Sequence, residues 1–407
     1  MAQIKIWIFS FLVATATATA EDWPKFGGPN GNFVTNEKNL KVNWEITEPK
    51  ILWKHKIGLG FSSIVEAKGK AYSQGYSNGK NTIFCFDTDS GELIWKKSYP
   101  SALGNNYFKG GSRATPTIFE GKLYLLSHDG DFYCMDAHDG SVQWSLNVTR
   151  DLKGVRPTWG FAGSPLIYGK SIILNVGAEG SSLVCLNPAN GKVIWKTGTY
   201  DAAYASINKR NKVEEFFLFH ADGLSVHRMN DGYEKSFYQH KTRYGINASQ
   251  PVEIGDKVLL SSAYGKGTAL VDFSSSKPKV VWKTGKISSQ MSTPIVHGGY
   301  LYGIHGQAGA RSRFSTLFCL DVENGKVIWE KTGFGLGTLI LVNNTLIVMS
   351  DQGEAVFTHA SSSGYKELSR FQILGGKDNW IPPSYANGRL HCRSSDGDWV
   401  CLSLLDN

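Results

Sequence analysis

The sequence lacks any apolar run of about 18 residues, the length that a membrane-spanning helix requires. Charged residues are also scarce, at 19% of the 407 residues, whereas aromatic residues reach 12%. Disordered chains show the opposite balance, with much charge and few aromatics. These features exclude a disordered chain and a multi-span membrane protein, and they predict a protein with a large hydrophobic core.

The motifs of the common metal and catalytic sites are missing as well. The ten histidines and six cysteines show no spacing typical of zinc ligands, and no two cysteines are adjacent. There is no nucleophile elbow of the Gly-x-Ser-x-Gly type and no phosphate-binding loop. The acidic pairs Asp129/Asp131 and Asp396/Asp398 each flank a glycine and are better explained by hairpin turns than by Ca²⁺. We therefore predict no metal site.

Basic residues exceed acidic residues only slightly, since the formal net charge is +8. The basic residues are scattered, and the densest run, Lys209 to Lys212, sits beside Glu214 and Glu215. This pattern is typical of a solvated loop and not of a nucleic-acid surface. We expect no nucleic-acid partner.

The first twenty residues form the pattern of a secretory signal peptide. One lysine precedes the apolar run from Trp7 to Ala14, and small residues at Ala18 and Ala20 suit cleavage near Ala20. The run is too short for a membrane span, and no cysteine follows the cleavage site to carry a lipid anchor. The sequence thus predicts a periplasmic or secreted protein, with residues 1–20 removed.

Glycine and tryptophan are abundant, with 45 and 12 residues, and much of both belongs to a repeat. The pattern Cys-x-Asp/Asn-x-x-x-Gly-x-x-x-Trp begins at Cys85, Cys134, Cys185 and Cys319. Weaker copies end at Trp282, Phe237 and Leu368. Each copy predicts a strand, a tight turn and a second strand. The Asx residue caps the turn, and the glycine adopts its positive φ. The Trp of the second strand is expected to pack between sheets.

Two further markers recur with the repeat. Turn sequences such as Asp129-Gly130 lie upstream of most copies, and segments of small residues and proline lie earlier still. Three markers per unit of roughly 40 to 50 residues predict four-stranded sheets arranged radially. We predict an all-β, eight-bladed β-propeller over residues 50–407, preceded by an N-terminal extension at 21–49.

The two ends of the predicted ring are complementary. The segment from Ile51 to His55 lacks three preceding strands, and the chain ends at Val400 to Leu404 without a Gly-x-x-x-Trp strand. The N-terminal strand is therefore expected to complete the last blade and close the ring. A solenoid would need capping units instead.

Cysteines in an exported protein often form disulfides, but here most occupy equivalent positions in different blades. Such positions are too far apart to bridge. We predict buried free thiols, with Cys392 and Cys401 as the sole plausible pair.

The repeats resemble those of the pyrroloquinoline-quinone (PQQ) enzyme family, with cysteine where that family mostly has alanine. The stretches from Trp23 to Pro29 and from Pro157 to Pro165 are similar to a group of exported bacterial PQQ-like propellers. The resemblance extends more distantly to BamB-type scaffold lipoproteins and to quinoprotein dehydrogenases. It implies the propeller fold. The adjacent Cys-Cys pair of quinoprotein alcohol dehydrogenases and the lipidated cysteine of the scaffold proteins are both missing.

Polar and aromatic residues that precede the small-residue segments are the candidate binding residues, because each blade contributes a loop near the ring axis. Arginine with planar aromatics suits a flat anionic ligand such as PQQ or an acidic sugar. The candidate ligand-binding residues are Arg113, Arg156, Trp159, Tyr204, Arg243, Tyr244, Asn247, Gln290, Asn379 and Trp380.

The sequence favours a binding or scaffold protein for a partner protein or a small anionic or carbohydrate ligand, acting without catalysis. The alternative is a PQQ-dependent dehydrogenase that oxidises an alcohol or sugar, with PQQ and Ca²⁺ as cofactors. Asp378 is the one acid that we nominate as its base.

Overall fold

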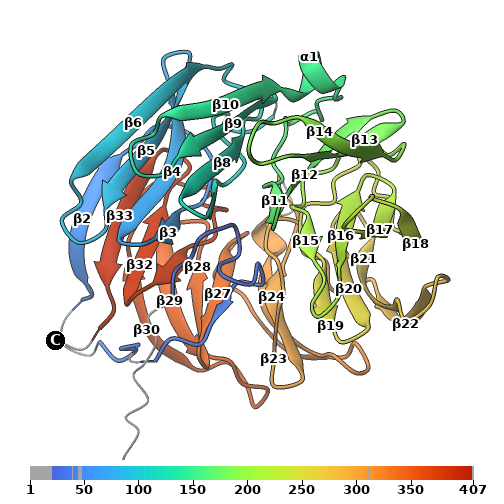
Figure 1. Cartoon of the computed structure of the whole chain (residues 1–407). Helices are drawn as coiled ribbons and strands as arrows, with labels where there is room; N and C mark the ends of the chain where they lie inside the picture. Colours follow the sequence, from blue (N-terminus) through green and yellow to red (C-terminus); the bar gives the residue numbers. More distant parts are fainter. Residues whose placement is uncertain (1–20, 39, 45–47, 106, 310–311, 406–407) are drawn as a thin grey trace, which may run out of the picture.

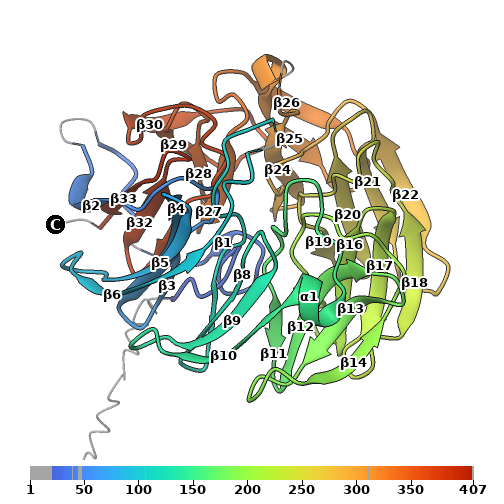
Figure 2. The same ribbon diagram turned by 90° about the horizontal axis from the view of Figure 1, so that it is seen from above.

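The described residues of the computed structural model, 21–38, 40–44, 48–105, 107–309 and 312–405, form eight sheets around one axis, each with four antiparallel strands. Figures 1 and 2 show the sheets following one another around the ring in chain order. The predicted all-β, eight-bladed propeller is confirmed. The predicted signal peptide, 1–20, lies outside the described residues.

Each blade consists of four strands, which follow one another from the axis to the outside of the ring. The innermost strands are β3 (Val65–Ala67), β7 (Thr117–Phe119), β11 (Leu166–Tyr168), β15 (Asn208–Lys209), β19 (Val252–Ile254), β23 (Ile295–His297), β27 (Thr338–Val342) and β31 (Ser384–Ala386). The second strands are β4 (Lys70–Ser77), β8 (Lys122–Leu126), β12 (Ser171–Ala178), β16 (Glu215–His220), β20 (Lys257–Ser262), β24 (Tyr300–His305), β28 (Thr345–Met349) and β32 (Arg389–Arg393).

The outer half of each blade holds the predicted repeat. The third strands are β5 (Lys80–Asp87), β9 (Asp131–Asp136), β13 (Ser181–Leu186), β17 (Gly223–Arg228), β21 (Gly267–Asp272), β25 (Thr316–Asp321), β29 (Glu354–His359) and β33 (Asp398–Ser403). The outermost strands are β6 (Leu93–Pro100), β10 (Val142–Asn147), β14 (Val193–Thr197), β18 (Glu234–Gln239), β22 (Lys279–Thr284), β26 (Val327–Lys331), β30 (Glu367–Gln372) and β2 (Lys50–Lys56).

The turn between the third and outermost strands follows the predicted chemistry. In the first blade, the Asp87 carboxylate accepts hydrogen bonds from the backbone N–H groups of Asp89 and Ser90, at 3.1 and 2.9 Å. Gly91 then takes a φ of +73°, a conformation that glycine adopts without strain. The side-chain cap and the glycine together let the strand reverse and the outermost strand begin at Leu93.

The hydrophobic core lies between the faces of neighbouring blades. One cluster, for example, joins Val65, Tyr72 and Trp95 of the first blade to Leu125 and Met135 of the second. Because each sheet is covered on both faces by its neighbours, the second strands of the blades, such as β16 and β28, are largely buried.

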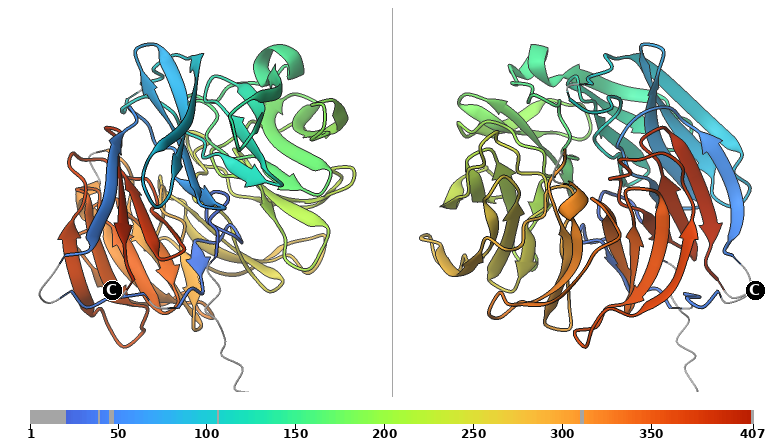
Figure 3. Two further views of the ribbon diagram at one scale, coloured as in Figure 1. Left: turned by 60° about the vertical axis from the view of Figure 1, so that its left-hand side comes forward. Right: turned by 180° about the vertical axis from the view of Figure 1, so that it is seen from behind.

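The ring closes as predicted. The N-terminal strand β2 pairs antiparallel with β33, placing Trp53 opposite Cys401. The first and last described parts of the ring thus share one sheet, β2-β33-β32-β31 (Figure 3). All six cysteines are buried and free, as expected, including Cys392 and Cys401.

The N-terminal extension is part of the ring interior. Trp23 and Glu66 of β3 exchange two backbone hydrogen bonds of 2.9 Å. Further along, β1 (Val34–Thr35) pairs parallel with β27 of the seventh blade. We call residues 21–35 the plug, because they cross the channel between these two blades (Figure 2).

Helical structure is slight in the described residues and consists of α1 (Val148–Leu152) and a 3₁₀ turn, η1 (Ser312–Phe314). The Asn147 side chain caps α1 by accepting from the N–H groups of Thr149 and Arg150. No helix in this part of the chain has the length and apolar character needed to cross a membrane.

Candidate functional site

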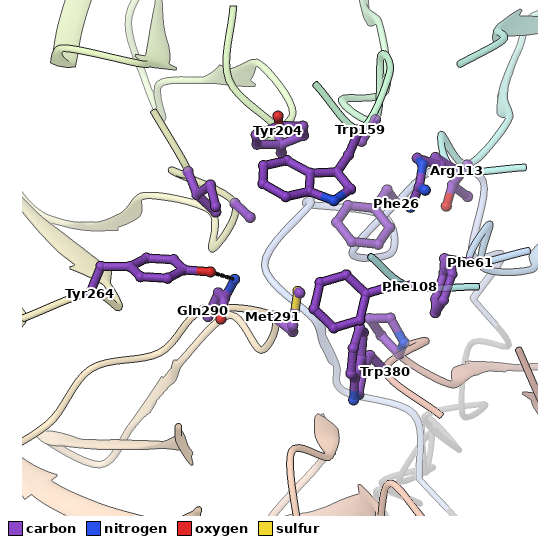
Figure 4. Close-up of a pocket in the computed structure, with 15 residues that line it drawn as sticks. Phe26, Phe61, Phe108, Arg113, Trp159, Tyr204, Tyr264, Gln290, Met291 and Trp380 are labelled. Atoms are coloured by element: carbon purple, nitrogen blue, oxygen red, sulfur yellow. Dashed lines mark hydrogen bonds between the residues drawn. The ribbon is translucent and has the colours of Figure 1, made fainter. Parts of the chain in front are cut away.

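A cavity of about 170 Å³ opens on the ring axis. Its walls come mostly from the loops that connect the outermost strand of one blade to the innermost strand of the next, and its floor is Phe26 of the plug (Figure 4). Tyr264 comes instead from the turn between β20 and β21. We call this cavity the funnel, and the side of the ring on which it opens the funnel face. The lining residues are Phe26, Phe61, Phe108, Arg113, Thr115, Trp159, Ala162, Tyr204, Ile246, Ala248, Tyr264, Gln290, Met291, Trp380 and Pro382.

Aromatic rings make up most of the funnel wall. Trp380 stacks on Phe61 with ring centroids 5.8 Å apart and meets Phe108 edge to face at 5.3 Å. On the opposite wall, Trp159 meets Tyr204 edge to face at 5.8 Å. These contacts hold the rings in fixed orientations, so the funnel presents a rigid apolar surface to a ligand.

Arg113 is the one cation among the lining residues. Its guanidinium lies 5.6 Å from the Phe61 ring and donates one hydrogen bond of 2.9 Å to the Gly104 carbonyl. Its buried Nε has no hydrogen-bond partner, and no carboxylate of the described residues forms an ion pair with it. Burial lowers the pKa of Arg113 because nothing anionic offsets the loss of water.

Polar groups without partners are few in the funnel. The Gln290 amide donates to the Tyr264 hydroxyl at 3.2 Å and accepts from the Ala308 N–H at 2.8 Å (Figure 4). Burial raises the pKa of Tyr204 to about 12, so its hydroxyl is neutral. The indole N–H of Trp380, by contrast, is buried without a partner in the described part of the chain. The Trp380 N–H and the Arg113 Nε are thus two buried donors of the funnel wall that have no acceptor among the described residues.

Five of the ten predicted residues line the funnel: Arg113, Trp159, Tyr204, Gln290 and Trp380. They come from five different loops, so the expectation that loops far apart in sequence converge near the axis holds for them.

Three of the other predicted residues lie near the funnel but outside it. Arg156 is half exposed and forms a 2.9 Å ion pair with Asp129. Arg243 lies over the ring of its neighbour Tyr244, which in turn meets Tyr264 edge to face at 5.4 Å.

Asn247 and Asn379 are fully buried, and their side chains form hydrogen bonds with backbone groups instead of lining the funnel. The Asn247 amide donates to the carbonyls of His220 and His240 and accepts from Ser262. Asn379 accepts from the Ser395 N–H and donates to the Gly375 carbonyl. The same loop position can therefore fix a loop or face the axis, and residue type alone does not distinguish the two roles.

The sequence reasoning missed most of the apolar wall. Phe61 lies beside small residues, and Tyr264 lies in a turn, where its φ is +58°. Phe26 belongs to the Trp23–Pro29 stretch, whose position across the channel only the fold shows. These residues carry no sequence signal for a ligand, because an aromatic near a turn is equally typical of packing.

The funnel does not fit PQQ with Ca²⁺. PQQ carries three carboxylates, whereas Arg113 is the only cation among the described lining residues. The described part of the chain also contains no group of three His, Cys, Asp or Glu side chains that could hold a metal ion. Asp378, the nominated base, is not among the lining residues. We therefore derive no chemistry through this cofactor.

The fold and the funnel together define a propeller of PQQ-like repeats with an aromatic central cavity. Comparison with known families then places it: the chain belongs to the family described as "Outer membrane protein assembly factor BamB", whose model matches residues 44–214 and 234–331.

Individual relatives match this chain at low sequence identity. The BamB protein of Moranella endobia is 22% identical over 338 residues, which cover 80% of this chain and 73% of that protein. A tetrathionate hydrolase of Acidithiobacillus ferrooxidans is 21% identical over 341 residues, 81% of this chain and 57% of that protein. Similar sequences thus occur in relatives with different names.

Solved structures show the same fold. BamB from Moraxella catarrhalis has a TM-score of 0.65 at 12% identity, with 88% of this chain and all of that chain covered. A quinohemoprotein alcohol dehydrogenase from Comamonas testosteroni reaches 0.70 at 13% identity, covering 96% of this chain and 82% of that one. At such identities the likeness concerns the fold alone.

Proposed function

We propose that this protein is an exported binding scaffold that holds a partner protein at the funnel. The observation that carries the proposal is Arg113, a desolvated cation in an aromatic cavity with no acidic partner among the described residues. A buried cation without a counter-charge is costly for the free protein. An incoming anion that pairs with it removes that cost on binding.

The chemistry of the funnel defines what it would accept. The stacked rings around Trp380 and Trp159 favour a flat apolar group, and Arg113 together with the Trp380 N–H favours an oxygen acceptor beside it. An aromatic side chain next to a carboxylate meets both requirements. A partner protein can present that pair on one exposed loop.

Family membership supports a role in protein binding. The relatives named outer membrane protein assembly factor act, by their name, in assembling other proteins at a membrane. The signal-peptide pattern of residues 1–20 is consistent with the same compartment. A small anionic or carbohydrate ligand is the competing occupant, and the test below separates it from a peptide.

The test measures binding of acetyl-Ala-Phe-Asp-Ala-amide, its Asn analogue and phenylacetate through the intrinsic tryptophan fluorescence of the funnel. We expect the Asp peptide to bind and the Asn peptide to bind roughly tenfold more weakly, as loss of one charge-assisted pair implies. Arg113→Gln should remove this difference, because the variant keeps a polar side chain but not the charge.

Arg156→Gln is the matched control. Arg156 is a neighbouring arginine outside the funnel that pairs with Asp129, so its loss should leave peptide binding unchanged. Tighter binding of phenylacetate than of the peptide would favour a small ligand over a protein partner. Equal affinity of the Asp and Asn peptides for the wild-type protein would refute the funnel as an anion-binding site.

A further inference from the structure

A second cavity of about 370 Å³ lies beneath the plug, on the face opposite the funnel. Phe26 contributes to both cavities, so the plug separates them. The second cavity is bounded by the plug, by the innermost strands β7, β11 and β15, and by the loop of residues 208–212 that follows β15. We call it the lower cavity.

The plug pairs with the exposed edges of some innermost strands and leaves another open. The N–H of Ile118, the middle residue of β7, donates to the Pro24 carbonyl at 2.7 Å. Glu66, the middle residue of β3, pairs with Trp23. These edges face the channel because each strand's other edge is bonded within its own blade.

Ile167 is the middle residue of β11 and occupies the same position in its blade. Ile118 pairs with Leu123 and Ile167 with Ile172, so the two N–H groups point the same way relative to their sheets. The plug turns back before it reaches β11, through Gly27 and Gly28 at φ of +80° and +81°. Within the described residues Ile167 has no backbone partner on this side, and it lines the lower cavity.

The walls of the lower cavity are basic. Lys25, Lys209, Arg210 and Lys212 line it, and no acidic side chain does among the described lining residues. Arg210 is neutralised by Glu215 and Glu253 at 2.8 and 3.3 Å.

The lysines divide into one that is bonded and two that are available. Lys209 donates to the carbonyls of Arg210 and Val213. The side-chain amino groups of Lys25 and Lys212 have no hydrogen-bond or ion-pair partner in the described part of the chain. Burial lowers the pKa of Lys25, and no carboxylate compensates. Two amino groups are thus free to meet an anion.

An open strand edge and unpaired cations together specify one kind of occupant. An extended peptide adds to a sheet edge through backbone hydrogen bonds, and its alternate side chains then meet the walls. We propose that the lower cavity binds an extended, acidic segment of a partner protein, whose backbone pairs with Ile167 and whose carboxylate pairs with Lys25. This site is separate from the funnel and does not depend on the function proposed for it.

The probe is fluorescein-labelled Val-Glu-Val-Glu-Val, with Val-Gln-Val-Gln-Val as its neutral counterpart, titrated against the full chain by fluorescence anisotropy. We expect the acidic peptide to bind and the Lys25→Gln/Lys212→Gln protein to bind it roughly tenfold or more weakly. Lys170→Gln is the control, because Lys170 lies beyond the end of β11 and is exposed but does not line this cavity. Arg113→Gln should also bind the probe normally, which separates this site from the funnel.

Hydrogen exchange of the Ile167 amide tests the strand pairing directly. Bound acidic peptide should slow exchange at Ile167, and Ile167→Pro, which removes the N–H at an edge where proline is tolerated, should abolish binding. Inorganic phosphate that competes fully without protecting Ile167 would show a simple anion site and overturn the peptide proposal. No binding by the probe, or equal binding by the double lysine variant, would overturn it as well.

Discussion

Trp144 of the second blade lies directly against Gly191 of the third: a Cβ placed on Gly191 would come within 2.6 Å of the Trp144 Cε3 atom. The Trp144 indole also donates a 2.9 Å hydrogen bond to the Pro188 carbonyl in the same turn. The relationship recurs at Trp53 and Gly91 and at Trp282 and Gly325. The Trp and Gly of the repeat thus form a contact between consecutive blades. The Trp of one blade packs against the turn that contains the Gly of the next blade.

Replacing Gly191 by alanine should destabilise the protein by more than its backbone strain alone. Gly180 provides the matched control, because its φ of +69° equals that of Gly191 within a degree but a Cβ there would meet nothing within 4 Å. We expect Gly180→Ala to cost about 1 kcal/mol and Gly191→Ala roughly 1–3 kcal/mol more, from overpacking against Trp144. Urea denaturation measures both, and equal losses would show that the Trp contact is unimportant.

The seam between the first and last blades contains a buried ion network. Glu66 of β3 accepts from His391 at 2.7 Å and from Arg389 at 2.5 Å, and both Glu66 and His391 are fully buried. Glu66→Ala should cost about 3–5 kcal/mol, because it leaves the buried His391 without its carboxylate, whereas Arg389 keeps its 2.8 Å pair with Asp89.

Lys56→Ala is the control for the seam. It breaks the exposed 3.0 Å pair with Asp398 and should cost about 1 kcal/mol or less. Denaturation midpoints distinguish the two variants, and a small effect of Glu66→Ala would mean that the seam is held by packing alone.

Acid should destabilise the fourth blade before the carboxylates titrate. Burial lowers the pKa of His220 and His240 to about 3 and that of His227 to about 4. Below pH 6.5 the unfolded chain takes up protons on these histidines and the folded chain does not, so stability falls as pH falls. The loss of stability from each histidine approaches about 1.4 kcal/mol per pH unit once the pH is well below 6.5 and still above the folded pKa.

The measurement is the free energy of unfolding between about pH 7.5 and pH 5.5. His227→Gln should flatten the profile by one histidine's share, whereas replacing the exposed His359 should leave the slope unchanged. If the His227 variant showed the same slope as the wild-type protein, His227 would not be buried in its neutral form.

The six buried thiols should be inert in the folded protein. Burial raises the pKa of Cys85 to about 12 and that of Cys319 to about 11, which leaves almost no thiolate at neutral pH. Iodoacetamide should label none of the six in native protein and all six after unfolding without reductant, as read by mass spectrometry. Fewer than six labels after unfolding would reveal a disulfide.

The repeat made the fold predictable because its information is local. Asp87 and Gly91 define a turn within five residues, and strands on either side follow from alternation and β-branched residues. Ring closure was also predictable. The Ile51–His55 segment is a single outermost strand without the rest of its blade, and the last strands of the chain form a blade that has no outermost strand.

The funnel was predictable only in part. Trp159 and Asn379 both precede an innermost strand, yet Trp159 lines the cavity while Asn379 bonds to the backbone of its own region. Loop position brings a residue near the axis, but packing within the loop decides whether its side chain reaches the cavity.

The sequence by itself determined the blade, its turns, the number of repeats and the burial of the cysteines, because these depend on contacts between near neighbours in the chain or on a period. The tertiary structure alone decided that Phe26 crosses the channel and becomes a wall shared by two cavities. It likewise decided that, among the described residues, Arg113 has no acidic partner and the edge of Ile167 stays open. These features depend on which distant segments meet at the axis, and no local pattern of residues encodes that meeting.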